Sequence, residues 1–196
     1  MSVYLKQVFV SIIFLIGPRG CGKSLMARLL ERQYGCRVCD TDELIRAATG
    51  KTVAELVEEG GWEAFRAAEK EALAEAVAGM ANAAGAQSTA VVATGGGMVL
   101  APENRARMRH EGTVIYLAAP LETLVARLSR RENDPARPSL SGLPLEAEVA
   151  KVLEERGPLY RDTAHHALDA SRPPEDVARD IYETVILPAR RDKDGI

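Results

Sequence analysis

The chain has 196 residues, of which 46% are hydrophobic and 27% are charged, and its net charge is −3. This length suits one globular domain with a complete core, so we expect a single domain over residues 1–196. The slightly acidic balance argues against a nucleic-acid-binding surface, which usually carries a basic patch. The apolar run near the N-terminus is too short to cross a membrane, and no small-residue cleavage site follows it. We therefore expect a cytoplasmic protein that binds neither nucleic acid nor membrane.

The first element is an apolar run over residues 8–16, which predicts a buried strand. Residues 17–24 follow with the spacing G-x-x-x-x-G-K-[ST], and residues 25–30 have apolar positions at helical spacing. This order is typical of a phosphate-binding P-loop, although a glycine-rich turn before a helix is the plainer alternative. On the P-loop interpretation, Lys23 reaches the β- and γ-phosphates of ATP and Ser24 ligates Mg²⁺. The residues expected to bind the nucleotide are Gly20, Cys21, Gly22, Lys23, Ser24 and Leu25.

The three cysteines, Cys21, Cys36 and Cys39, are expected to stay reduced, because the chain shows no secretory context. Cys36 and Cys39 form a C-x-x-C pair, but no second pair and no nearby histidine completes a zinc site. A lone C-x-x-C is a weak signal for redox or metal chemistry. We therefore favour structural thiols, with a redox or metal role as the alternative.

A short strand over residues 36–39 leads to Asp40, Thr41 and Asp42, where a parallel sheet presents its loops to a ligand. One of the two carboxylates could hold Mg²⁺ through water while the other meets the hydroxyl of an acceptor. The plainer alternative is a helix N-cap at Asp40 or Thr41.

The rest of the chain alternates between helices and strands. Thr52 and Glu55 form a capping box that opens a short helix, which ends at two glycines, 60–61. Further helices are expected at 62–81, from 102, and over 120–131, 146–156 and 174–187, and strands at 90–93, 113–117 and 166–170. This alternation predicts a three-layer α/β/α P-loop domain with a central parallel sheet of about five strands. A mobile lid is expected at about 130–144, which shows no helical period, and a frayed tail at 190–196.

Four further features could contact a ligand, and each has a plainer interpretation. Arg66 and Glu69 lie one helical turn apart, which also fits a surface ion pair. The glycine turn 95–97 ends a strand and allows close backbone approach to a ligand, or forms a plain tight turn. Arg137, between two prolines of the expected lid, could offset charge on a transferred phosphate. Arg156 ends a helix, where it could also interact with the helix dipole.

Together these residues match one pattern, and the sequence closely resembles the shikimate kinase family, most of all the second of its two bacterial isoenzyme types. The matching segments occur in the family's order, span roughly residues 10–170, and are 16–24, Asp40-Thr41-Asp42, Phe65-Arg66-x-x-Glu69, 93–97, Arg137-Pro138-Ser139-Leu140 and Glu155-Arg156-x-x-Leu159-Tyr160. The resemblance implies transfer of the γ-phosphate of MgATP to the 3-hydroxyl of shikimate, within aromatic amino acid and chorismate synthesis. We expect shikimate as the small-molecule partner and a monomeric enzyme.

The resemblance also implies roles for single residues. Lys23, Asp42 and Arg137 are implied to be catalytic. Of these, Asp42 orients or deprotonates the acceptor hydroxyl, and Arg137 meets the ATP phosphates from the lid. Ser24 and Asp40 are implied to hold Mg²⁺. The residues implied to bind the acceptor are Asp42, Arg66, Gly95, Gly96, Gly97 and Arg156, and those implied to border adenine are Arg130 and residues 172–173.

Two other functions fit parts of the sequence. Another small-molecule kinase of the same fold, such as a gluconate or nucleotide kinase, would keep the P-loop and change the acceptor site. A nucleotide acceptor would need a base-binding pocket, which the sequence does not reveal. A non-catalytic ligand-sensing module would be expected to carry a DNA-binding segment or a damaged catalytic set. Lys23, Ser24, Asp42 and Arg137 are all present, which favours the enzyme.

Overall fold

The structure is a computed structural model that describes residues 11–82, 89–130 and 143–194. At its centre five parallel strands form one sheet in the order β2–β3–β1–β4–β5. Ile12 of the central strand pairs with Ala90 on one side and with Gly112 on the other. The predicted parallel sheet is therefore confirmed. The strands are β1 (Ile12–Ile16), β2 (Arg37–Asp40), β3 (Ala90–Ala93), β4 (Gly112–Ala118) and β5 (His166–Asp169).

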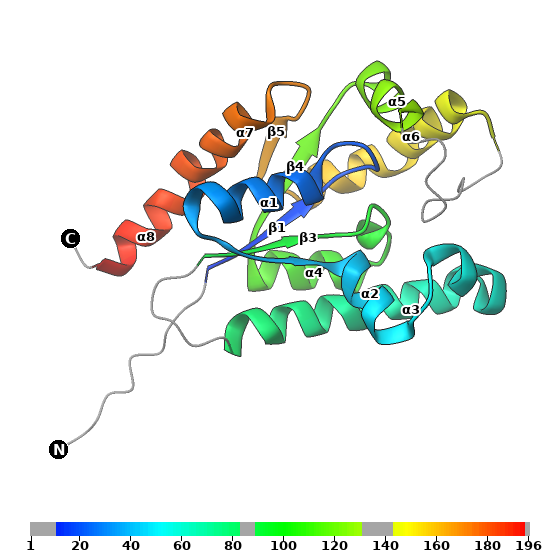
Figure 1. Cartoon of the computed structure of the whole chain (residues 1–196), viewed down its shortest axis with the longest axis horizontal. Helices are drawn as coiled ribbons and strands as arrows, with labels where there is room; N and C mark the ends of the chain where they lie inside the picture. The colour runs from blue at the N-terminus through cyan, green and yellow to red at the C-terminus, as the bar shows by residue number, and fades with distance from the viewer. Residues whose placement is uncertain (1–10, 83–88, 131–142, 195–196) are drawn as a thin grey trace.

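Helices cover both faces of the sheet, so the molecule has three layers (Figure 1). Helices α1 and α7 pack on one face, and α3 and α4 on the other. Among the described residues, no helix is both long and apolar enough to span a bilayer. The helices are α1 (Lys23–Tyr34), α2 (Thr41–Thr49), α3 (Val53–Asn82), α4 (Pro102–Glu111), α5 (Leu121–Ser129), α6 (Leu145–Thr163), α7 (Pro174–Ile181) and α8 (Leu187–Asp194), with a 3₁₀ turn η1 (Met98–Leu100) and a π-helical turn η2 (Tyr182–Ile186).

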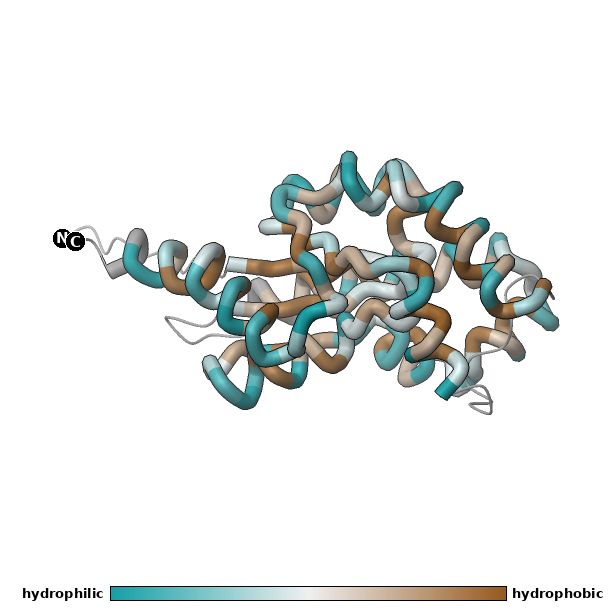
Figure 2. The backbone as a smooth tube through the Cα atoms, turned by 90° about the horizontal axis from the view of Figure 1, so that it is seen from above, coloured by the Kyte–Doolittle hydropathy of each residue, from teal (hydrophilic) through white to brown (hydrophobic). Residues whose placement is uncertain are grey.

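The core lies on both sides of the sheet, and β1 contributes to each side. Ile13 and Leu15 pack toward α1 and α7, whereas Phe14 and Ile16 pack toward α3 and α4. All four side chains are at most 1% exposed. Strands covered on both faces are apolar at successive positions rather than at alternate ones. Figure 2 shows the result as brown segments through the centre of the molecule, with teal along the outer helices.

The segment after β2 forms α2, so the N-cap interpretation of this segment is correct. Asp40 Oδ1 accepts a hydrogen bond of 3.0 Å from Asp42 N and thereby caps the helix. The capping box is also confirmed, because Thr52 N donates to Glu55 Oε2 at 2.7 Å. At the expected glycine break, Gly61 has a φ of +70° and a ψ of 179°, which are not helical angles, so two helical segments of α3 meet at a kink there and the predicted break is confirmed.

The length of α6 differs from the prediction. The sequence predicts a helix over 146–156, and Pro158, two residues later, lacks a backbone N–H and would normally interrupt a helix. In the structure α6 continues through Pro158 as far as Thr163. Side chains in the last two turns of α6 are therefore held on the same rigid element as Arg156.

The last helices also differ from the prediction. The frayed tail predicted from residue 190 is wrong for residues 190–194, which are helical. Arg190 Nη2 donates to the backbone oxygen of Tyr34 at 2.8 Å. The rings of Tyr34 and Tyr182 stack with their centroids 4.1 Å apart. These contacts attach the C-terminal helices to the end of α1.

Candidate active site

The P-loop joins β1 to α1 at the carboxyl end of the sheet. Its backbone angle φ is +144° at Gly17, +82° at Gly20 and +102° at Gly22, values that favour glycine. Such conformations turn backbone N–H groups toward an anion, and the N-terminus of α1 adds positive charge from its dipole. Lys23 Nζ donates to the backbone oxygens of Gly17 at 2.7 Å and of Pro18 at 3.0 Å. The loop thus has the geometry of a phosphate site with an ammonium group folded over it.

Ser24, in the first turn of α1, faces Asp40 at the end of β2. Ser24 Oγ donates a hydrogen bond of 2.6 Å to Asp40 Oδ2. Oxygen ligands suit Mg²⁺, which proteins often hold through one or two groups plus substrate phosphates. Among the described residues no group of three or more His, Cys, Asp or Glu is placed to hold a metal ion by itself. Ser24 and Asp40 therefore fit a cation that is shared with a nucleotide.

Asp42 reaches the glycine turn from the first turn of α2. A Cβ atom on Gly95 would lie 2.8 Å from Asp42 Oδ1 and 3.1 Å from Glu69 Oε1, so glycine leaves room for both carboxylates. Glu69 Oε1 has no hydrogen-bond partner within the described part of the chain. Thr41 is fully buried, and its Oγ1 accepts a hydrogen bond of 2.9 Å from Gly95 N. The turn is thus tied directly to α2.

Arg66 and Glu69 form an ion pair that lies inside the molecule. Glu69 is only 1% exposed and Arg66 is 25% exposed, so the interpretation as a surface ion pair is wrong. Burial raises the pKa of the Glu69 carboxyl, and the charge of Arg66 opposes that shift. A Cβ atom on Gly97 would collide with the Arg66 guanidinium. The same guanidinium lies 5.5 Å from the ring centroid of Trp62 and 5.4 Å from that of Phe65.

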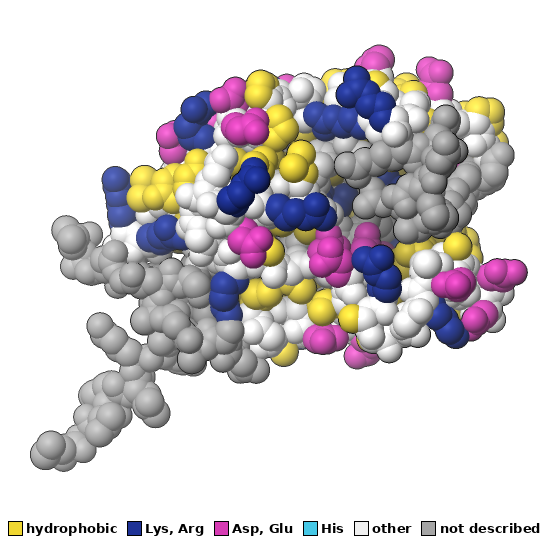
Figure 3. Space-filling view, viewed as in Figure 1, with side chains coloured by type: hydrophobic (Ala, Val, Ile, Leu, Met, Phe, Trp, Pro, Cys, Tyr) yellow, Lys and Arg dark blue, Asp and Glu magenta, His cyan; other side chains and the backbone are white. Residues whose placement is uncertain are grey.

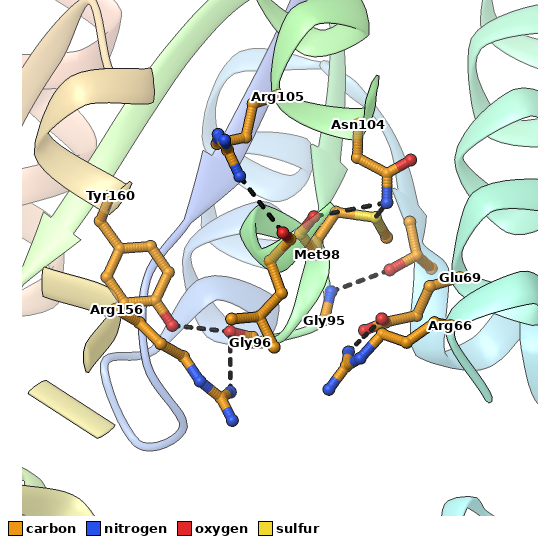
Figure 4. Close-up of polar contacts among 11 residues, drawn as sticks. Arg66, Glu69, Gly95, Gly96, Met98, Asn104, Arg105, Arg156 and Tyr160 are labelled. Atoms are coloured by element: carbon orange, nitrogen blue, oxygen red, sulfur yellow. Dashed lines mark hydrogen bonds and ion pairs between the residues drawn. The ribbon is translucent and has the colours of Figure 1, made fainter. Parts of the chain in front are cut away.

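The backbone oxygen of Gly96 accepts hydrogen bonds from two side chains of α6 (Figure 4). Arg156 Nη1 donates at 3.3 Å and Tyr160 Oη donates at 2.6 Å. Tyr160 is 1% exposed, and its ring stacks on that of Tyr116 in β4 with centroids 5.2 Å apart. Burial raises the pKa of the Tyr160 hydroxyl, which therefore stays protonated and able to donate at neutral pH. The sequence did not predict this contact, because it requires α6 to continue beyond Arg156.

The P-loop and the glycine turn are in contact with each other. A Cβ atom on Gly96 would lie 3.5 Å from both Arg19 N and Gly17 O. Figure 4 shows the guanidinium groups of Arg66 and Arg156 on the same side of the turn. The predicted phosphate-binding and acceptor-binding residues therefore meet at one edge of the sheet, where ligands bind in open parallel sheets.

Other predicted contacts are not seen in this arrangement or lie outside the described residues. Arg137 and most of the expected lid lie outside the described residues. Arg130 is exposed at the C-cap of α5. Arg172 Nη1 donates to Asp180 Oδ2 at 2.6 Å, in an exposed ion pair. Leu25, in the first turn of α1, is 50% exposed.

Arg127 contacts the P-loop although the sequence did not single it out. Its Nη1 donates to Gly20 O at 3.4 Å and its Nη2 to Ala170 O at 2.8 Å. The side chain thus joins the phosphate loop to the segment after β5. The only signal in the sequence was its place on the same helix as Arg130, one turn earlier.

Cys36 and Cys39 do not come together. Cys36 packs in the core beneath α1, whereas Cys39 packs on the opposite face of the sheet with α3. Burial raises the pKa of the Cys36 thiol, and burial with nearby carboxylates raises that of Cys39 to about 11. The alternative of a C-x-x-C redox or metal site is therefore wrong, and both residues are buried or half-buried thiols.

Several known proteins with similar sequences carry the name shikimate kinase 2. A family model described as shikimate kinase matches residues 19–186. Shikimate kinase 2 of Enterobacter sp. (strain 638) is 48% identical over 175 residues, covering 89% of this chain and 95% of that protein. Shikimate kinase 2 of Sodalis glossinidius (strain morsitans) is 46% identical, with 87% and 93% covered. Shikimate kinase from Acinetobacter baumannii in complex with shikimate is structurally similar, with a TM-score of 0.80, 30% identity, and 92% and 96% of the two chains covered.

Proposed function

The chain belongs to the shikimate kinase family, and we propose that it transfers the γ-phosphate of MgATP to the 3-hydroxyl of shikimate, giving ADP and shikimate 3-phosphate. The observation that carries the acceptor assignment is that Arg66 of α3 and Arg156 of α6 reach the same glycine turn. Two guanidinium groups from different helices suit a small carboxylate through charge-assisted, potentially bidentate hydrogen bonds. This product belongs to aromatic amino acid and chorismate synthesis.

The two carboxylates beside Gly95 suit the hydroxyl groups of shikimate. Asp42 would orient or deprotonate the 3-hydroxyl, because a general base must lie within hydrogen-bond reach of the proton that it takes. Glu69 Oε1, which is buried without a partner among the described residues, would accept a hydrogen bond from a second hydroxyl. These carboxylates and the two arginines together match the polar groups of a hydroxylated carboxylic acid.

On the nucleotide side, Lys23 would exchange its contacts with Gly17 O and Pro18 O for the β- and γ-phosphates of ATP. Ser24 and Asp40 would hold Mg²⁺, which neutralises charge on the phosphate during transfer. Arg137 is proposed to approach the same phosphates from a lid at about 130–144. Closure of such a lid would exclude water, which competes as a phosphoryl acceptor.

We further propose that the whole chain is one kinase domain that acts as a cytoplasmic monomer on small molecules. On the face shown in Figure 3, Lys and Arg side chains are interspersed with Asp and Glu side chains and form no single basic patch. This distribution supports a small-molecule acceptor over a nucleic acid.

The decisive experiment is a coupled assay of ADP release with MgATP, in which shikimate is compared with quinate, gluconate, CMP and AMP. We expect strong turnover with shikimate only. Turnover with gluconate or a nucleotide would keep the P-loop assignment and overturn the acceptor. ATP binding without turnover on any of the five acceptors would favour the ligand-sensing alternative.

A further inference from the structure

Two unequal donors share the Gly96 carbonyl oxygen. The bond from Tyr160 Oη, at 2.6 Å, is short, whereas the bond from Arg156 Nη1, at 3.3 Å, lies at the long end of the hydrogen-bond range. Tyr160 is fixed, because it is 1% exposed and stacked on Tyr116. Arg156 is only partly buried, and its Nε has no partner within the described residues. Of the two donors, Arg156 is therefore the one that can leave.

Binding of a carboxylate would draw the Arg156 guanidinium away from the Gly96 carbonyl. A bidentate pair aligns two N–H groups of one guanidinium with the two carboxylate oxygens, and this geometry differs from a single bond to a backbone oxygen. Once the acceptor covers the turn, water no longer reaches the Gly96 carbonyl. A covered carbonyl without a donor is costly. The turn therefore needs a second donor that stays in place when Arg156 moves.

We propose that Tyr160 is a positioning residue for acceptor binding, whose hydroxyl keeps the Gly96 carbonyl paired so that Arg156 is free to bind the carboxylate of the acceptor. The proposal rests on the proposed function, since it describes how that acceptor is held. Tyr160 acts on Arg156 indirectly, because both side chains belong to α6 and donate to the same Gly96 carbonyl. Without the hydroxyl, Gly96 and the acceptor compete for one guanidinium.

The first test compares Tyr160→Phe with Tyr116→Phe. Both variants remove one oxygen from the same stacked ring pair, but no hydrogen bond of the Tyr116 hydroxyl is found within the described residues. We expect Tyr160→Phe to raise the KM for shikimate about tenfold, with kcat and the KM for ATP changed less than about twofold. Tyr116→Phe should leave all three unchanged. Equal kinetics of the two variants, or a loss confined to kcat, would overturn the proposal.

The second test asks whether the effect passes through Arg156. Arg156→Ala should raise the KM for shikimate by itself, and adding Tyr160→Phe to it should change that KM less than about twofold, because no guanidinium remains to compete for. Full additivity would mean that the hydroxyl acts only on the local structure, which overturns the proposal. If wild-type protein showed no activity on shikimate, the proposed function itself would fail, and no variant is needed to see that outcome.

A measurement on the wild type covers the case in which Tyr160→Phe does not fold. NMR of the arginine Nε–H groups follows Arg156 directly, and the resonance is identified by its absence from the spectrum of Arg156→Lys. We expect saturating shikimate to shift this resonance. An Arg156 resonance that does not respond to shikimate would show that the guanidinium never leaves Gly96, and the proposal would be wrong.

Discussion

The Ser24 hydroxyl donates a 2.6 Å hydrogen bond to one oxygen of Asp40, while the other oxygen of Asp40 caps α2. One carboxylate thus links the helix that follows the P-loop to the helix that carries Asp42. The proposed cation site and the N-cap use different oxygens of the same side chain. Different substitutions at Asp40 can therefore separate the two roles.

Asp40→Asn and Asp40→Ala should both weaken the response of activity to Mg²⁺, but only Asp40→Ala should also lower the free energy of unfolding. Asn keeps an oxygen for the cap but removes the negative charge, whereas Ala removes both. We expect both variants to need about 10- to 100-fold more Mg²⁺ for half-maximal activity. Only Asp40→Ala should also lose about 1 kcal/mol of unfolding free energy. Unchanged Mg²⁺ titrations would remove Asp40 from the cation site.

Asp42→Asn should lower kcat by about 100-fold or more, because the amide cannot accept the proton of the acceptor hydroxyl. Binding of ATP, measured by calorimetry, should stay near that of the wild type, since Asp42 lies beside Gly95 on the acceptor side. Substantial turnover by this variant would exclude Asp42 from the chemistry.

Gly97→Ala should weaken shikimate binding by displacing Arg66. The backbone of Gly97, with φ −95° and ψ −6°, is ordinary for alanine, so the change acts through the collision of the new methyl group with the guanidinium. We expect a higher KM for shikimate and an unchanged KM for ATP. Gly79→Ala is the matched control, because its Cβ would meet nothing within 4 Å and a helical alanine stabilises by up to about 1 kcal/mol. Equal shikimate kinetics in the two variants would contradict the prediction.

Arg66→Ala should destabilise the protein more at pH 8 than at pH 5. The pKa of Glu69 is raised above its ordinary value of 4.5 by burial, so the folded state holds the proton more tightly than the unfolded state. Stability therefore falls as the pH rises through the window above 4.5. Removal of Arg66, whose charge opposes the shift, moves the pKa further up and deepens that loss. Urea denaturation of the variant and the wild type at both pH values measures it.

The matched control for this pH effect is the double variant Arg66→Ala/Glu69→Gln. The amide carries no charge at either pH, so the extra loss at pH 8 should disappear. If the loss persisted, a group other than Glu69 would be its source.

Binding of shikimate to these variants can be followed by the fluorescence of Trp62, the only tryptophan of the chain, which lies beside Arg66 in the wild type.

The architecture could be predicted from the sequence because β1, β3 and most of β4 are apolar at successive positions and each P-loop residue has a fixed place in its motif. Local signals also sufficed for the capping box at Thr52 and Glu55. The same local reasoning failed at Pro158, where tertiary packing of α6 outweighs the missing backbone donor. It also failed at residues 190–194, whose helix is held by the distant Tyr34.

The residues of the candidate site were predictable as separate segments, but their mutual contacts were not. Their spacing predicts that Arg66 and Glu69 are neighbours on a helix, but it does not show that Glu69 is buried against Gly95. Likewise the motif that contains Arg156 and Tyr160 does not reveal that both donate to one carbonyl 60 or more residues earlier in the chain. Such contacts depend on how helices are placed over the sheet.

The twelve residues of α1 form a rod about 18 Å long, with the phosphate loop at one end and Tyr34 at the other. Since Tyr182 and Arg190 attach the C-terminal helices at that far end, α8 extends away from the phosphate loop (Figure 1). A dye or a surface linker coupled at the end of α8 would therefore leave catalysis undisturbed. The end of α8 is therefore a suitable attachment point for immobilising the protein in binding assays.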